Sequence, residues 1–315
     1  MTKEILVLGG CGYVGTPLVE DLLKKGHVIT VVDNQWFGNY LPKNNKNLKI
    51  IKDDIRNMNE NIFLNKDILI HLANICNDPS VDLNPVLSWE VNVLSTKRIC
   101  DLSIKYGLKK ILFASSGSVY GISDKERVTE DLELKPISVY NKTKMIAERV
   151  LLSYSNLIKI LIIRPATVCG WSPRMRLDVA VNMLTYQALS VGKIKVFGGS
   201  QIRPNIHIRD MVRVYNFFEK NDVEGGCYNA GFENISIIDL AEKIKNKISC
   251  TIDIVPSNDP RSYRQDSSKL LSLGFEKKYD VNYAIDELIK KFHEKQLVED
   301  ENSYTVKKMK GLNIV

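Results

Sequence analysis

The fold of this chain is decided by Leu8-Gly9-Gly10-Cys11-Gly12-Tyr13-Val14-Gly15, a stretch near the start of its 315 residues. The stretch follows an apolar run, Ile5–Leu8, and precedes a segment in which apolar residues recur four apart, at Val14, Leu18 and Leu22. Glycines permit positive φ and let backbone N–H groups approach an anion at the positive end of a helix. The stretch therefore predicts a strand, a tight turn and a helix whose first turn can hold a pyrophosphate.

The next predicted strand supports a dinucleotide at this turn. Val28–Val32 is apolar and ends in Asp33, where a second strand presents an acid to the adenosine ribose hydroxyls. That carboxylate would repel a 2′-phosphate, and no arginine follows it in Asn34-Gln35-Trp36. NAD is therefore favoured over NADP. A third strand ends in Asp53-Asp54-Ile55, which is well placed for the adenine edge.

The rest of the first half repeats the same alternation of strands and helices. Strands are predicted at Leu48–Lys52, Ile68–Leu72, Lys110–Ala114 and Ile160–Ile163, and helices after Gly15 and over Pro85–Tyr106 and Tyr140–Tyr154. We predict an α/β fold with a Rossmann-type doubly wound parallel sheet over residues 1–165. Residues 166–315 are predicted to form mainly a smaller α/β domain that binds the substrate, with 205–222 returning to the first domain.

Composition and charge exclude several classes of protein. The chain is 44% hydrophobic with a formal charge of +7, which excludes disordered and fibrous proteins. The basic residues are scattered among acids, so we expect no nucleic-acid partner, and no apolar run is long enough for a membrane span. The six cysteines show no CxxC spacing and the histidines have no metal-ligand pairing. We expect a cytoplasmic protein with reduced thiols, without a metal site and without a membrane partner.

A tyrosine and a lysine mark the predicted catalytic helix. Tyr140 and Lys144 are four residues apart, so the phenol and the ammonium share one helix face, and the cation is expected to lower the pKa of the phenol. The segment from Ser115 to Gly121 follows an apolar strand, which puts Ser116 at the carboxyl end of the sheet, where α/β folds bind ligands. A phenol that accepts a proton from an alcohol is therefore predicted. A serine hydrolase is disfavoured because the GxSxG elbow is absent.

In this order the motifs GGCGYVG, Asp33, HLAN (71–74), SSGSVYG, YNKTK and RPATVCG resemble those of the extended short-chain dehydrogenase/reductases that act on nucleotide-activated sugars. The resemblance covers residues 3 to about 270. It implies that Tyr140 is the acid/base, that Lys144 binds the nicotinamide ribose and that Ser116 hydrogen-bonds the reacting oxygen. The residues it implies around NAD are Gly9, Gly12, Tyr13, Val14, Gly15, Asp33, Asn34, Asp54, Ile55, Leu72, Ala73, Asn74, Tyr140 and Lys144.

The reaction class follows from two positions that depart from related dehydratases. Those relatives carry adjacent acids after the catalytic hydroxyl residue, where this chain has Gly117 and Ser118. Dehydration and decarboxylation are therefore disfavoured. What remains is oxidation at C4 of a nucleotide sugar, as a 4-epimerase or a 4-dehydrogenase, with a 4-keto-sugar reductase as an alternative. A protein that binds NAD as a sensor on the same fold is the alternative from another class, although it would need no proton acceptor.

Polar residues of the second half are implied to bind the sugar nucleotide. SPRMR (172–176), Arg203 and Arg261 resemble the loops that hold its diphosphate, which suits the planar fork of arginine. The full set of substrate-binding residues is Ser116, Ser118, Thr167, Arg174, Arg176, Asn182, Arg203 and Arg261. SPRMR and RSYR (261–264) also resemble a subgroup that oxidises GDP-heptose at C4 in capsule polysaccharide biosynthesis. We further expect a homodimer through a four-helix contact of the helices over Pro85–Tyr106 and Tyr140–Tyr154.

Overall fold

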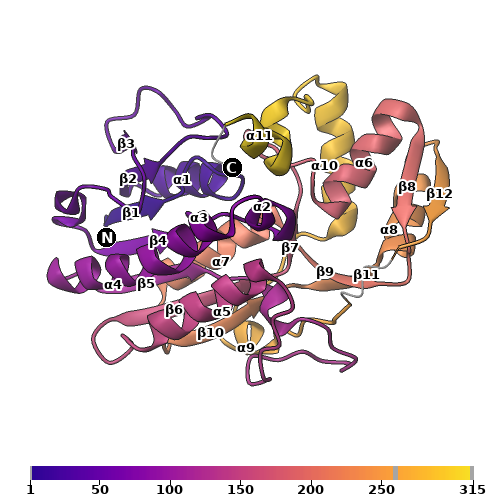
Figure 1. Cartoon of the computed structure of the whole chain (residues 1–315). Helices are drawn as coiled ribbons and strands as arrows, with labels where there is room; N and C mark the ends of the chain where they lie inside the picture. Colours follow the sequence, from indigo (N-terminus) through magenta and orange to yellow (C-terminus); the bar gives the residue numbers. More distant parts are fainter. Residues whose placement is uncertain (1, 258–261, 313–315) are drawn as a thin grey trace.

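The computed structural model describes residues 2–257 and 262–312, and its centre is a parallel seven-stranded sheet with helices on both faces (Figure 1). The strand order is β10-β6-β5-β4-β1-β2-β3, so the order reverses between β1 and β4. Ligands bind at such a reversal in doubly wound folds. The predicted Rossmann-type fold is confirmed. The strands are β1 (Glu4–Leu8), β2 (Val28–Asp33), β3 (Leu48–Lys52), β4 (Ile68–His71), β5 (Lys110–Ala114), β6 (Lys159–Pro165) and β10 (Gly226–Ala230).

The central strands β1, β4, β5 and β6 are buried on both faces of the sheet, which explains their continuously apolar runs. Alternate residues of β1 point to opposite sides: Ile5 and Val7 pack with α1 (Gly15–Lys24) and α7 (Ile208–Lys220), whereas Leu6 and Leu8 pack with the helices of the other face. The second set consists of α4 (Ser95–Lys105) and α5 (Val139–Leu152), which carry Ile99, Ala147 and Leu151 into that core.

The predicted helix over Pro85–Tyr106 is interrupted by a π-helical segment. It consists of α3 (Pro85–Trp89), the π-helical η2 (Glu90–Leu94) and α4. The interruption lies beside the cavity described below, which Val91 lines. π-helical insertions of this kind are frequent at functional sites.

The second half forms a smaller layer with its own core. Its sheets are β11-β9-β7 and β12-β8, and α6, α8 and α10 cover them. These elements are β7 (Thr167–Cys169), α6 (Ala180–Val191), β8 (Lys193–Phe197), β9 (Ile202–His207), β11 (Glu233–Ser236), α8 (Ile237–Lys245), β12 (Thr251–Val255) and α10 (Val281–His293). Besides the expected residues 205–222, a later segment also joins the first half of the chain. This segment is β10, which pairs with β6 in parallel.

Short elements complete the chain. The C-terminal segment, for which the sequence predicts no role, forms η4 (Glu301–Ser303) and α11 (Thr305–Gly311), and α11 packs on α2 (Asp78–Leu83) (Figure 1). The others are η1 (Glu60–Phe63), η3 (Gly117–Tyr120) and α9 (Ser268–Ser272). Across residues 2–257 and 262–312, every helix is too short or too polar to cross a lipid bilayer.

Candidate active site

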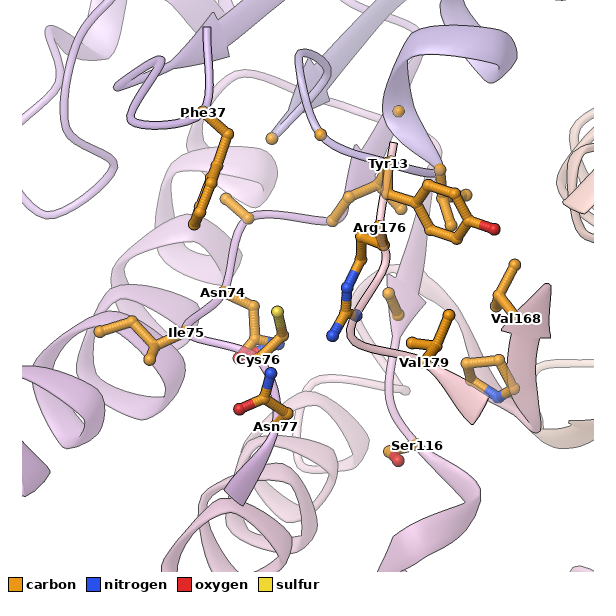
Figure 2. Close-up of a pocket in the computed structure, with 18 of the residues that line it drawn as sticks. Tyr13, Phe37, Asn74, Ile75, Cys76, Asn77, Ser116, Val168, Arg176 and Val179 are labelled. Carbon is orange, nitrogen blue, oxygen red and sulfur yellow. The ribbon is translucent and has the colours of Figure 1, made fainter. Parts of the chain in front are cut away.

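A cavity of about 510 Å³ lies at the carboxyl ends of the central strands, between the sheet and the second half of the chain. It is lined by residues from both halves (Figure 2). The predicted site residues that line it are Gly9, Gly12, Tyr13, Val14, Gly15, Asp33, Asn34, Asp54, Ile55, Leu72, Ala73, Asn74, Ser116, Ser118, Tyr140, Lys144, Thr167, Arg174, Arg176 and Arg203. One cavity thus brings together the residues assigned to cofactor, catalysis and substrate.

The glycine loop is shaped to let a ligand approach its backbone. Gly9 has a φ of 81°, and a Cβ there would meet the backbone nitrogen of Ala73 at 2.5 Å. A Cβ at Gly15 would meet the Gly9 carbonyl oxygen at the same distance. At Gly12, by contrast, the nearest atom would be the Gly9 oxygen at 3.4 Å, so a side chain there would enter the cavity. This open cradle before α1 fits the pyrophosphate of a dinucleotide.

Asp33 is fixed at the end of β2 and lines the same cavity. Its carboxylate accepts hydrogen bonds from the backbone N–H groups of Cys11, at 2.9 Å, and Gln35, at 2.7 Å. Burial raises the pKa of Asp33, and the two backbone hydrogen bonds oppose that rise. An acid held beside the glycine loop fits the ribose hydroxyls of a dinucleotide. Trp36 and Phe37, which the sequence analysis did not single out, line the wall next to it.

The predicted catalytic residues come from two adjacent elements. Ser116 caps η3 by accepting from the backbone N–H of Ser118, and Tyr140 and Lys144 lie in the first half of α5. The ammonium of Lys144 donates to the Ala114 carbonyl at 2.6 Å and lies 4.9 Å from the Phe113 ring centroid. Lys144 is buried, and this desolvation lowers its pKa to about 7.

The expected lowering of the Tyr140 pKa is wrong. Burial raises the pKa of this phenol, while a hydrogen bond with Ser116 and the charge of Arg176 lower it in part. The ammonium of Lys144 donates a hydrogen bond to the Ala114 carbonyl and none to this phenol. The physical reason is desolvation, which disfavours phenolate in an enclosed site.

A buried polar network supports the catalytic helix from behind. Glu148, one turn beyond Lys144 on α5, accepts from Arg164 of β6, with Nε to Oε1 at 3.0 Å and Nη2 to Oε2 at 2.7 Å. Ser115 also donates to Glu148, and Arg164 donates to the Tyr120 hydroxyl at 2.7 Å. Residues next to Ser116 and on the helix of Tyr140 are thereby tied to one ion pair. The sequence analysis missed this network, because nothing in the spacing of the two residues indicates that they pair.

Two substrate assignments need correction or fall outside the structure. Asn182 is fully buried and does not line the cavity. Its amide accepts from the Gly170 N–H and donates to the Tyr13 hydroxyl and the Arg176 carbonyl, so it organises the loop and does not contact substrate. Arg261 lies outside the described residues. The Tyr13 hydroxyl is likewise engaged in this scaffold, donating to the Gly170 carbonyl at 2.6 Å.

The loop after HLAN also contributes to the cavity, although it was not predicted. Ile75, Cys76, Asn77 and Asp78 line it. Figure 2 shows the first three of them in the wall of the cavity. Asn77 has a positive φ of 71° and caps α2 by accepting from the Ser80 N–H. The available signal in the sequence was the position of these residues, directly after the HLAN motif at the end of a predicted strand.

The sequence of this chain matches a known protein family and several related proteins. Residues 5–231 match the NAD dependent epimerase/dehydratase family. The chain is 30% identical to a putative UDP-glucose 4-epimerase of Methanocaldococcus jannaschii, over 90% of this chain and 97% of that protein. It is 26% identical to UDP-glucuronic acid decarboxylase 1 of Danio rerio, over 97% of this chain and 76% of that protein.

Solved structures of nucleotide-sugar enzymes are also similar to this chain. The UDP-glucuronic acid 4-epimerase of Bacillus cereus, solved with UDP-glucuronic acid and NAD, superposes with a TM-score of 0.80 at 27% identity. The alignment covers 91% of this chain and 99% of that one.

Proposed function

Because the chain belongs to the NAD dependent epimerase/dehydratase family and its cofactor is NAD, we propose that it oxidises C4 of a nucleotide-activated sugar to a 4-keto species. Epimerases, dehydratases and decarboxylases all occur among the relatives and neighbours of this chain. The choice among these reactions rests on the residues beside Ser116.

The proposal is carried by one observation: Ser116, Tyr140 and Lys144 line one cavity with the glycine loop, and the two residues directly after Ser116 are not acids. Elimination of water needs a further acid and base at the sugar, and Gly117 and Ser118 offer neither. Proton transfer at one hydroxyl needs only Tyr140, so the site supports oxidation and reduction at a single carbon.

Each residue then has a defined task. Tyr140 accepts the proton of the C4 hydroxyl, and Ser116 hydrogen-bonds the same oxygen as it becomes a carbonyl. Bound NAD would supply the hydride acceptor for C4 at this site. Lys144 is assigned to the cofactor ribose, as its place in the same cavity and the family resemblance suggest. Burial lowers the pKa of Lys144 to about 7, and the charge of Glu148 opposes this lowering.

The replacement of Tyr140 with Phe tests this assignment. Turnover should fall by about 10²–10⁴, the usual contribution of a positioned acid or base, while NAD binding is retained. The ring packs in the core of the first half, and Phe preserves that packing. Turnover of Y140F at the wild-type rate would contradict the assigned role.

An assay of the purified protein with nucleotide sugars separates the finer alternatives. Accumulation of reduced cofactor with a keto product indicates a 4-dehydrogenase. A C4 stereoisomer without net reduction indicates an epimerase, and consumption of reduced cofactor by a 4-keto sugar indicates a reductase. Bound NAD with no reaction on any sugar would favour a sensor instead.

For the sugar itself we propose GDP-heptose, in the biosynthesis of a surface polysaccharide. Support comes from the resemblance of SPRMR and of RSYR to the subgroup that oxidises this sugar. Thr167, Ser118 and Arg203, which line the cavity, are proposed to contact the sugar nucleotide. The panel should therefore include UDP-glucose and UDP-glucuronic acid beside GDP-heptose, and a preference for a UDP-sugar would overturn this part.

The protein is further proposed to be a homodimer through α3, η2, α4 and α5. Val86 and Leu94 on these elements are 70% and 64% exposed, unlike Val91, which is buried in the monomer. Met145 and Val150 of α5 are partly buried. The exposed residues are available to a second copy of the chain.

A further inference from the structure

The segment of residues 170–178, between β7 and α6, is fastened to the glycine loop. Tyr13 of that loop donates its hydroxyl to the Gly170 carbonyl at 2.6 Å, and the Ser172 hydroxyl donates to the Tyr13 carbonyl at 2.9 Å. This segment, called the strap below, therefore lies against the cofactor side of the cavity.

The C-terminal residues hold the end of the strap. The backbone N–H of Leu177 donates to the Ser303 carbonyl at 2.9 Å, and the backbone N–H of Thr305 donates to the Asp178 carboxylate at 3.0 Å. Arg176 also pairs with this carboxylate, with Nε to Oδ1 at 2.8 Å. Although burial opposes it, the charge of Arg176 and these hydrogen bonds lower the pKa of Asp178 to about 2. The strap is thus anchored at both ends.

Arg174 of the strap carries a buried charge that forms no direct ion pair within the described part of the chain. Its side chain is almost fully buried, and its guanidinium lies 4.2 Å from the Phe37 ring centroid. Among the described residues no carboxylate forms an ion pair with it, and its Nε has no hydrogen-bond partner. A buried charge in this state is costly unless an anion joins it. The cavity that Arg174 lines is where such an anion can bind.

The neighbours of both arginines identify the part of the cavity they serve. The charge of Arg174 acts on Asp33, the residue at the adenosine end of the predicted cofactor site. The charge of Arg176 acts on Tyr13 and Tyr140, which lie at the glycine loop and the reacting end. Figure 2 shows the Arg176 side chain extending into the cavity toward Asn74 and Cys76. The two arginines thus line the cavity near residues assigned to both the adenosine end and the reacting end of the cofactor site.

The geometry points to a role for Arg174 and Arg176 in binding the pyrophosphate of NAD, opposite the glycine loop, in place of the diphosphate of the sugar nucleotide. The planar guanidinium can meet two phosphate oxygens at once, and the strap would then cover the bound cofactor. Arg203, which comes from β9 in the second half, is left for the sugar nucleotide. This inference rests on NAD as the cofactor and not on the proposed C4 chemistry.

The test measures NAD binding without any sugar present. Wild-type protein, stripped of nucleotide, and the variants R174M, R174K and R203M are titrated with NAD by calorimetry. R174M should raise the dissociation constant about 10- to 100-fold, as loss of a charge-assisted hydrogen bond predicts, and R174K should fall between it and wild type. R203M should bind NAD as wild type does. R127M, which removes an exposed arginine paired with Asp266, is the control for loss of one positive charge.

Three further results decide the matter. Added salt should weaken NAD binding more steeply in wild type than in R174M. The reason is that R174M lacks one of the charged phosphate contacts that salt screens. NAD-loaded R174M should bind GDP and UDP as wild type does. Equal NAD affinity in wild type and R174M would overturn the inference, as would weakened GDP or UDP binding with unchanged NAD binding. If R174M does not fold, R174K, which retains the charge, decides by the same titration.

Discussion

The replacement of Glu148 with Gln should destabilise the protein strongly without changing the shape of the side chain. Glu148 and Arg164 are 1% and 4% exposed, and they form two hydrogen bonds of 3.0 and 2.7 Å. Burial alone would lower the pKa of Arg164, and the hydrogen bond and charge of Glu148 raise it. Because the intrinsic pKa of arginine is above about 12, the guanidinium stays charged when its partner is made neutral. E148Q therefore leaves an uncompensated buried cation.

The expected loss is about 3–5 kcal/mol in the free energy of unfolding, the usual effect of removing one partner of a buried pair. Since domains are stable by only about 5–15 kcal/mol, this is a large share of the total. Equilibrium unfolding in urea, followed by circular dichroism, measures it as a lower midpoint at unchanged slope. The double variant E148Q/R164M removes both charges and should be more stable than E148Q alone.

Activity should fall in the same variant for a separate reason. The Glu148 charge raises the pKa of Lys144, so its loss favours the neutral amine at neutral pH. The optimum of turnover for the residual folded enzyme should therefore move to lower pH. If E148Q loses less than about 1 kcal/mol and keeps its pH profile, the network does not have the energetic role assigned to it.

Two other replacements address features outside this network. D178N removes a carboxylate whose pKa is lowered from 3.8 to about 2, so it should cost roughly 2 kcal/mol at neutral pH. A lowered carboxyl pKa stabilises the fold above the unfolded-state value, so the difference from wild type should shrink as pH falls from about 4 toward 2; a constant difference in urea unfolding would contradict this origin. L94E places a charge on the proposed dimer surface and should yield monomers by analytical ultracentrifugation, whereas I254E, on exposed Ile254 of β12, should leave the mass unchanged. A dimeric L94E protein would place the contact elsewhere.

The fold could be predicted because its signals are local. The predicted β3 and β5 match Leu48–Lys52 and Lys110–Ala114 at both ends. The reason is clearest for β5, whose continuous apolar run is buried in the sheet, whereas β3 is a partly exposed strand at the edge. The π-helical η2 was not predicted, because its residues have the same periodicity as an ordinary helix. Strand β10 was also missed, because its sequence, GCYNA, lacks an apolar run.

The site was predictable to the extent that its residues belong to contiguous motifs. The glycine loop, Asp33, Ser116, Tyr140 and Lys144 are each positioned by the strand or helix beside them, and all line one cavity. The surroundings of Arg174 and the burial of Asn182 depend on how a loop docks on residues far away in the chain. That docking is determined by contacts such as Tyr13 with Gly170, which no spacing reveals.

The late arrival of β10 also bears on how the chain is made. Because β10 pairs with β6 at one edge of the main sheet, the first 165 residues cannot complete that sheet until residue 230 has been synthesised. Until then β6 presents unpaired backbone groups, which are prone to associate with other chains. On the ribosome, the nascent protein therefore has an interval of exposure in which a chaperone would have most to protect.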